Sequence, residues 1–344
     1  MVNSQFQAKK LRYFIQGLFL AFILQLIWRR RLYGEASSII PSPEAYCPFG
    51  GLESLYSFIT SGLFIRHIHL SNLVVFIALL TTVIIGKSFF CGWICPVGTL
   101  QEWVRKVGRF MDRLPAVLYL RRRLRKSALL KTLDRVAINF KYLLLVYILL
   151  ETSRLGALIF RSWDPYPGLI SLGELRWTTG VYILLVILNL SLVTERPFCR
   201  YACPLGALIG VLGRLSLIKV TRNADNCIQC GLCHHKCPMG VNVKDYQRIG
   251  STECISCLNC LEICPKRALE LRVPKVKIPI SKYLYVALVM IIFLGMINGA
   301  KYFNYWSTSG RYGSGKNAVI PQDVHDEGYS WSEIRGRRDQ GGYK

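Results

Sequence analysis

The sequence CIQCGLCHHKCP at residues 227–238 is followed by CISCLNCLEICP at residues 254–265, and both follow the pattern C-x2-C-x2-C-x3-C-P. This pattern is typical of cysteines that ligate 4Fe–4S clusters, where three thiolates come from one run and the fourth comes from the other run. The two runs predict an α+β ferredoxin-like domain with two clusters, which we place at residues 216–274.

The spacing divides the eight cysteines into two ligand sets. Set 1 is Cys227, Cys230, Cys233 and Cys264, and set 2 is Cys254, Cys257, Cys260 and Cys237. A zinc site is the alternative, but zinc generally takes four ligands in two pairs, and eight cysteines in two such runs argue against it. Because iron ligands must stay thiolates, we expect this segment in the reducing cytoplasm.

Long apolar segments lie on both sides of the cysteine runs. The chain has 344 residues, of which 52% are hydrophobic, and its mean hydropathy is +0.30. Five segments have about the ~17–25 residues that cross a bilayer. They are Arg12–Trp28, Leu70–Gly86, Lys141–Phe160, Trp177–Val193 and Tyr283–Gly299. The first lacks a small-residue cleavage site, which favours an uncleaved anchor over a signal peptide.

These segments predict a mainly α, polytopic membrane protein with an inserted ferredoxin domain. We expect a four-span membrane domain at residues 1–215, a fifth transmembrane helix at 275–300 and an extracytoplasmic tail at 301–344. The formal net charge is +24, from 44 Lys and Arg against 20 Asp and Glu. Such a balance could indicate nucleic acid binding. However, many of the basic residues crowd a loop between two spans, at 105–135, so we expect no nucleic acid partner.

The same basic loop predicts the orientation. The positive-inside rule places it on the cytoplasmic side of the inner membrane, together with the N-terminus and the cysteine runs. The tail then lies outside. The triplet Arg29–Arg31, at the outer end of the first span, runs against this bias without outweighing it.

The membrane segments contain an internal repeat. Residues 46–55 (YCPFGGLESL) parallel 163–172 (WDPYPGLISL), and residues 90–100 (FCGWICPVGTL) parallel 198–208 (FCRYACPLGAL). The four-span core is therefore expected to be a duplicated two-span unit. Parallel repeats of this kind are related by an axis along the membrane normal, which would bring the two C-x3-C-P motifs together.

Together, the C-x3-C-P motifs supply four thiols, Cys91, Cys95, Cys199 and Cys203. We expect these axial cysteines to share a third iron–sulfur cluster, because one pair alone cannot hold a cubane. Two structural thiol pairs, or redox disulfides, are the alternative. Cys47 has Asp164 as its repeat mate. It is predicted to be a packed thiol in an outer turn, with a ligand or a partner-facing thiol as the alternative.

Three further residues are candidates for quinone and proton handling. His67 and His69 flank the outer start of the second span, where they could serve a quinol site or simply form hydrogen bonds. Glu151 lies at membrane depth, where an ionisable group is a functional candidate. An ion pair with Arg154 is its alternative role.

From about residue 11 to residue 272, the spans, both C-x3-C-P motifs and the two ferredoxin runs resemble the NapH family of membrane polyferredoxins. The C-terminal regions of NosR-type regulators and the CcoG-type assembly proteins are similar. The resemblance implies quinol oxidation and electron delivery to an extracytoplasmic partner within a redox complex, so whether the chain is itself an enzyme stays open. A maturation reductase for a metalloenzyme and a redox-sensing membrane anchor are alternatives. The fifth span, the tail and Cys47 depart from the family pattern.

Overall fold

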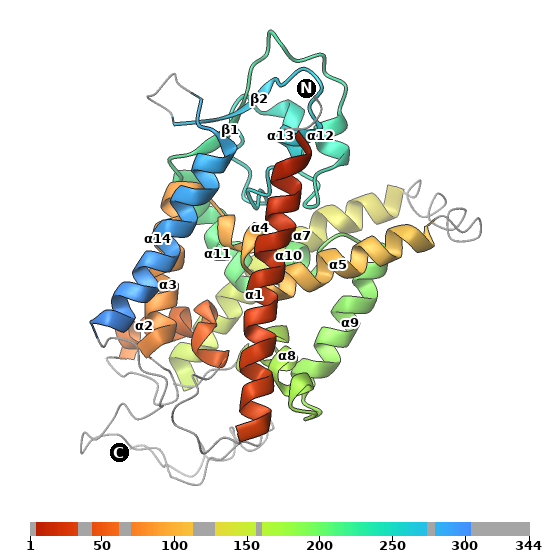
Figure 1. Ribbon diagram of the computed structural model, residues 1–344. Coiled ribbons are helices and arrows are strands. Elements are labelled where there is room, and N and C mark those ends of the chain that lie inside the picture. The colour runs from red at the N-terminus through yellow and green to blue at the C-terminus, as the bar shows by residue number, and fades with distance from the viewer. Residues whose placement is uncertain are drawn as a thin grey trace. The chain divides into compact units, whose positions relative to one another are not determined.

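The computed structural model describes residues 5–33, 43–61, 70–112, 128–155, 160–273 and 279–303. All of them belong to one compact unit, Met1–Gly310. The unit is mainly helical, as Figure 1 shows, and the described residues form a single small sheet.

Three helices of the described part are long and apolar enough to cross a membrane, and they make the chain a membrane protein. They are α1 (Gln5–Tyr33), α7 (Ala128–Leu155) and α14 (Lys282–Tyr302). The apolar helices α3 (Leu70–Gly86) and α9 (Thr179–Val193) have 17 and 15 residues. At ~1.5 Å per residue, both are shorter than the ~30 Å of a hydrocarbon core.

These bounds adjust the predicted spans. The third was expected to run to Phe160, but α7 ends at Leu155 and Phe160 begins the short 3-10 helix η2 (Phe160–Ser162). The fourth was expected from Trp177, and α9 begins two residues later. Thr178 is the N-cap residue of α9 and has an extended backbone, so the helix begins after it.

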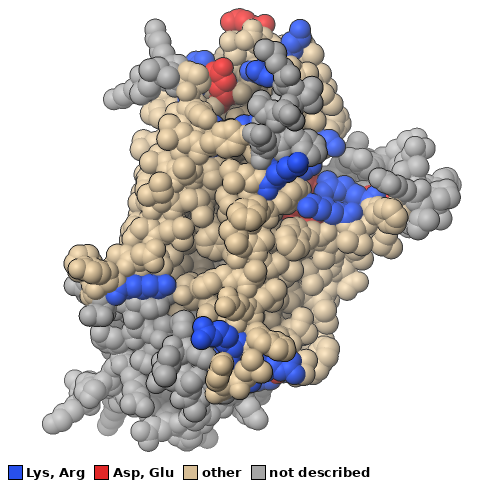
Figure 2. Space-filling view, viewed as in Figure 1, with Lys and Arg blue, Asp and Glu red and all other residues tan. Residues whose placement is uncertain are grey.

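The helices expose large apolar side chains, as membrane helices do where they face lipid. Leu143, Val146 and Leu150 protrude from α7, and Leu284 and Ile291 protrude from α14. In Figure 2, Lys and Arg lie above and below a band of uncharged residues on the face shown. An apolar band between two charged levels is the surface that a bilayer requires.

The secondary structure follows the sequence repeat. In each half a 3-10 turn precedes a short helix, an apolar helix, a five-residue helix and a helix that begins at a Cys-Pro pair. The first half is η1 (Pro43–Tyr46), α2 (Pro48–Ser61), α3, α4 (Phe89–Trp93) and α5 (Pro96–Met111), and the second is η2, α8 (Pro165–Gly173), α9, α10 (Pro197–Tyr201) and α11 (Pro204–Leu212). Figure 1 shows α2 and α8 at the end of the unit opposite the N-terminus.

The cysteine-rich segment lies beside the N-terminal end of α1, where α13 (Asn259–Ile263) contacts it. Strands β1 (Lys219–Arg222) and β2 (Leu269–Arg272) pair antiparallel, with Lys219 opposite Arg272. Between the strands lie α12 (Leu232–His235), the 3-10 helix η4 (Val243–Asp245) and α13, and η3 (Gly213–Leu215) precedes β1. The paired strands hold the two ends of this segment together.

One apolar core joins the membrane helices to the cysteine-rich segment. Phe89 of α4 stacks on Trp93, with ring centroids 5.1 Å apart, and meets the ring of Tyr285 of α14 edge-on at 5.7 Å. The Tyr285 hydroxyl donates to the carbonyl of Gly86 at 2.5 Å. These contacts fix α4, which carries Cys91, between α14 and the cysteine-rich segment.

Candidate functional site

The cysteines of set 1 wall a common cavity. Cys264, from the second run, lines it together with Cys227, Cys230 and Cys233, and its empty volume is about 410 Å³ with open solvent included. Cys230 is exposed. Arg222, Lys244 and Lys266 are the charged residues of the lining, and no carboxylate is among them. The cavity therefore gathers four thiols under a positive rim near the surface.

Left-handed turns bend both runs around their cysteines. Gln229 and Gly231 have φ angles of 52° and 73°, and the equivalent Ser256 and Leu258 have 48° and 59°. Alternating right- and left-handed residues turn successive backbone N–H groups toward one point, which makes an anion-binding concavity. A cluster with four thiolates is such an anionic group.

Backbone N–H groups also donate to the fourth cysteine of each run. The N–H of Val241 lies 3.4 Å from Cys237 Sγ, and the N–H of Ala268 lies 3.3 Å from Cys264 Sγ. The two bonds are equivalent in the two runs, since each comes from the residue four positions after the cysteine. Hydrogen bonds to ligand sulfurs tune cluster potentials.

The thiols of set 2 are more buried than those of set 1, and each raises the pKa of its neighbours. Burial and then neighbouring thiols raise the pKa of Cys237 to about 12. The same causes raise the pKa of Cys260, with Cys257, Cys254 and Cys237 as its neighbours. In set 1, the Gln229 N–H and Arg222 lower the pKa of Cys227. Converging buried thiols become thiolates when a cationic centre compensates them, so this donor set fits an iron–sulfur cluster.

The four axial cysteines line a second, larger cavity, with an empty volume of about 870 Å³, open solvent included. Cys91 lies in α4 and Cys199 in α10, while Cys95 and Cys203 cap the helices α5 and α11. The proline after each capping cysteine suits the first helical position, where no N–H bond is needed. The structure thus brings both C-x3-C-P motifs to one space.

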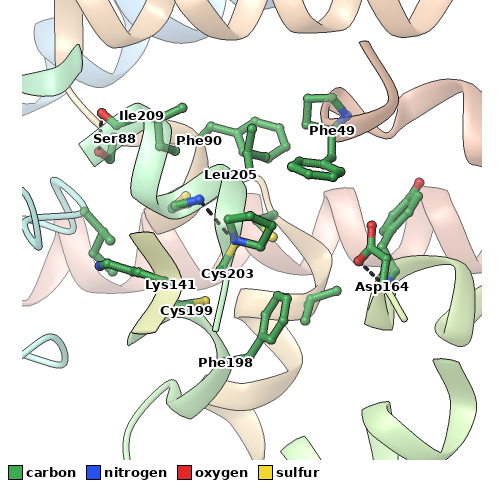
Figure 3. Close-up of a pocket in the computed structure, with 18 of the residues that line it drawn as sticks. Phe49, Ser88, Phe90, Lys141, Asp164, Phe198, Cys199, Cys203, Leu205 and Ile209 are labelled. Carbon is green, nitrogen blue, oxygen red and sulfur yellow. Dashed lines mark hydrogen bonds between the residues drawn. The ribbon is translucent and has the colours of Figure 1, made fainter. Parts of the chain in front are cut away.

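Two polar groups donate to axial sulfurs of the second repeat half, one from the same half and one from the first half. The Gly206 N–H donates to Cys203 Sγ at 3.3 Å, and the Gln101 side-chain amide donates to Cys199 Sγ at 3.6 Å. Figure 3 shows Cys199 and Cys203 on the Lys141 side of the cavity, with Phe49 and Phe198 beside the open space and Asp164 at the opposite end.

At that opposite end, two repeat mates meet. Cys47 Sγ lies 3.8 Å from Asp164 Oδ2, and the other carboxylate oxygen accepts the Tyr166 N–H at 3.0 Å. Cys47 is partly buried and lines the cavity, which agrees with the packed thiol predicted for it. The contact brings these two repeat mates together at one end of the cavity.

Within the described ranges, no three Cys, His, Asp or Glu side chains surround a point closely enough to hold a single metal ion. The set 1 cysteines and the axial cysteines are instead spread around the walls of the two cavities. A cubane carries its thiolates on four separate irons, so it needs walls of this kind rather than one tight centre.

Of the three candidates for quinone and proton handling, the structure describes one, Glu151. His67 and His69 lie outside the described residues. Glu151 lies near the end of α7, 3.3 Å from the guanidinium of Arg154, whose side chain is exposed. The ion pair named as its alternative role is therefore present.

The sequence patterns missed a buried ionic network. Glu102 of α5 accepts from Arg12 of α1 and, at 2.7 Å, from Arg196 beside α10. All three side chains are nearly or fully buried. Burial alone would raise the Glu102 pKa, but Arg12 and Arg196 outweigh it and lower that pKa to about 2. A sign existed in the sequence, because Arg12 stands at the start of an apolar segment where an unpaired charge is costly.

Arg105, at the start of the basic stretch 105–135 that was expected to form a loop, lies in the helix α5. Its side chain is buried, and it donates to the Leu192 carbonyl and to Asp112, the latter at 2.7 Å. It thereby ties α5 to the end of α9. This arginine stabilises packing between the two repeat halves, so it adds little to an exposed basic surface.

Helix α4 is in direct contact with the cysteine loop of set 2. The Trp93 indole N–H donates to the Ser256 carbonyl at 3.0 Å. A Cβ on Gly92 would fall within 3.0 Å of the Ile255 carbonyl oxygen. Arg12 spans the contact, donating to the Gly92 carbonyl at 3.0 Å and to Asn259 Oδ1 at 2.9 Å. This junction, residues 92–93 with 255–256, joins the axial motif to set 2.

Comparison with known families agrees with these cysteine sites. Residues 68–125 and 177–223 match the family described as 4Fe-4S binding domain, and residues 219–265 match the 4Fe-4S dicluster domain. The first match covers both halves of the repeat. No solved structure matches the chain.

Curated relatives extend the match over most of the chain. It is 31% identical over 298 residues to YccM of Escherichia coli K12, provisionally named an electron transport protein, covering 81% of this chain and 80% of YccM. Identity to the ferredoxin-type protein NapH of the same strain is 28%, over 74% of this chain and 83% of NapH. Identity to the regulatory protein NosR of Pseudomonas aeruginosa is 30%, over 51% of this chain and 23% of NosR.

The cysteine sites, the membrane helices and these relatives define a ferredoxin-type 4Fe–4S protein of electron transport. The chain belongs to the NapH/NosR/YccM-like family of 4Fe–4S polyferredoxins.

Proposed function

We propose that the chain is the membrane subunit of a redox complex and passes electrons between the quinol pool and an oxidoreductase with an extracytoplasmic partner. The observation that carries the proposal is the junction, where α4, which holds Cys91, packs on the loop that holds Cys254 and Cys257. The three cysteine groups thereby form a series from the exposed set 1, through set 2, to the axial cavity.

In this proposal, each ferredoxin set holds one 4Fe–4S cluster and the axial cysteines hold a third iron–sulfur cluster. The clusters supply one-electron redox chemistry. The protein residues hold the thiolates, bury set 2 and the axial cysteines, and keep the groups close. Cross-ligation by Cys237 and Cys264 is supported by the set 1 cavity, which Cys264 lines with the three cysteines of the first run.

We further propose five membrane crossings, with α3 and α9 as the two short ones. Apolar side chains exposed on both helices support this, among them Ile77 and Ile84 on α3 and Tyr182 and Val186 on α9. The N-terminus and residues 216–274 are assigned to the cytoplasmic side, and the end of α14 and the tail to the outer side. His67, His69 and Glu151 stay candidates for quinone or proton handling.

The function is tested with the purified chain in detergent under anaerobic conditions. On addition of a reduced quinol analogue, we expect visible bleaching and EPR signals of reduced clusters, and a quinone-site inhibitor should block both. Reduction by dithionite alone would contradict a quinol site in this chain and assign that site to a partner.

The third cluster is tested separately with Cys199→Ser. We expect loss of the iron of the axial centre, about one third of the total for a 4Fe–4S centre and about one fifth for a 2Fe–2S centre, because this centre loses one of its four thiolates while both ferredoxin sets stay complete. Iron analysis and EPR measure this. Cys47→Ser is the matched control, since Cys47 lines the same cavity outside the four-cysteine group. Unchanged iron content and spectra in Cys199→Ser would refute the axial cluster.

A further inference from the structure

Arg196 is a buried arginine at the meeting point of both repeat halves. Its Nη1 donates to the Cys91 carbonyl at 2.5 Å, and its Nη2 donates to Glu102 at 2.7 Å. The side chain is 1% exposed. One guanidinium therefore holds the backbone of an axial cysteine from the first repeat while its own main chain leads into Cys199 of the second.

The backbone around Arg196 adopts an unfavourable conformation to place it there. Its φ angle is 50°, in the left-handed region that favours glycine. Gly98 leaves room for the guanidinium, because a Cβ there would lie 2.9 Å from Nη1. Residues held in such a region persist when the surrounding structure requires them, and they cluster at functional sites.

The network around Arg196 has more positive than negative charge. Arg12 and Arg196 share the carboxylate of Glu102. The other side chains that hydrogen-bond to Arg12 or Glu102 are the neutral Asn259, Gln16 and Tyr13. The charge of Glu262 also interacts with Arg12, but Lys282 and Lys9 act on the same carboxylate, so it does not neutralise the two arginines. A buried cation without a counter-ion is costly. Among the described residues, Arg196 Nε also has no hydrogen-bond partner. The surplus charge points to an anionic group beside the network.

The cysteines on the two sides of the junction are that anionic group. The Arg196 guanidinium lies close enough to Cys199 of the axial group and to Cys257 of set 2 to interact with the charge of both thiolates. These two cysteines are the thiols that act most strongly on Arg196, and neither belongs to set 1. A positive charge stabilises a centre more strongly after it gains an electron, and it therefore raises the reduction potential.

We propose that Arg196 is a positioning residue that raises the reduction potential of the centres held by set 2 and by the axial cysteines, and so sets the free energy of electron passage across the junction. The inference rests on the proposed electron-transfer function and adds to it a residue that raises the potentials of the inner part of the series. Glu102 moderates the effect by neutralising part of the positive charge.

The test is a potentiometric titration followed by EPR on the full chain in detergent, with iron content and thermal unfolding measured on the same samples. Arg196→Gln should lower the potential of the set 2 centre and of the axial centre. We expect a tenfold change in the one-electron equilibrium, which is 59 mV, and no shift for set 1. Arg109→Gln is the control, because Arg109 lies in the same region but pairs with Glu195 on the surface.

Two further variants are measured beside it, and Arg196→Lys keeps the inference testable if Arg196→Gln fails to fold. Arg196→Lys keeps the charge, so its potentials should stay near wild type even where unfolding temperature drops. Glu102→Gln removes the compensating charge, so both inner potentials should rise. Equal shifts in all centres, or no shift with full iron content, would overturn the inference. A wild-type chain with only the two ferredoxin centres would refute the axial cluster of the proposed function, whereas a selective set 2 shift in that chain would still support the role of Arg196.

Discussion

Gly92→Ala should destabilise the chain and weaken the link between the axial motif and set 2. The added Cβ would fall within 3.0 Å of the Ile255 carbonyl oxygen, a backbone atom of the set 2 loop that cannot rotate away. Either α4 or the loop must move. Overpacking of this kind costs about 1–3 kcal/mol, and movement of α4 would also strain the Trp93 bond to Ser256.

The measurement combines thermal unfolding with the rate of electron passage after rapid reduction of the exposed centre. We expect a lower unfolding temperature and slower appearance of reduced inner centres. Gly295→Ala is the matched control, because no atom of the described part of the chain lies within 4 Å of a Cβ at Gly295 in α14. A helical glycine in open space should gain slightly from alanine. If Gly92→Ala matched Gly295→Ala in both measurements, the junction would not be the tight contact described.

The cysteine sites could be predicted from the sequence because the spacing that a cluster needs is local in the chain. Thiolate spacing within a run follows from the cluster geometry, and the expected grouping of Cys264 with the first run agrees with the cavity that they line. The duplication was also readable, because each copy keeps a Cys-Pro pair at the start of a helix.

The sequence could not reveal contacts that depend on packing between distant segments. Arg12, Glu102 and Arg196 belong to three helical regions, and nothing in the spacing links them. Arg105 looked like part of a basic loop because burial is not visible in a charge pattern. The third span was extended too far for the same reason, since apolar residues such as Phe160 also occur in turns that pack on the core.

Glu102→Gln should be among the most destabilising single substitutions in the chain. Glutamine keeps the shape but leaves Arg12 and Arg196 buried without their carboxylate, and removal of one partner from a buried pair costs about 3–5 kcal/mol. Thermal unfolding in detergent measures the loss. Glu270→Gln is the control, because the Glu270–Arg272 pair is exposed and contributes about 0–1 kcal/mol.

The pH dependence gives this prediction a second check. The pKa of Glu102 is about 2 in the folded chain, below its usual value of 4.5, so the carboxylate favours folding above pH 4.5 and this stabilisation is lost as the pH falls toward 2. The difference in stability between wild type and Glu102→Gln should therefore stay constant from pH 8 to pH 5. A difference that shrank steadily across this range would mean that Glu102 titrates near neutrality, and the two arginines would then not hold it ionised.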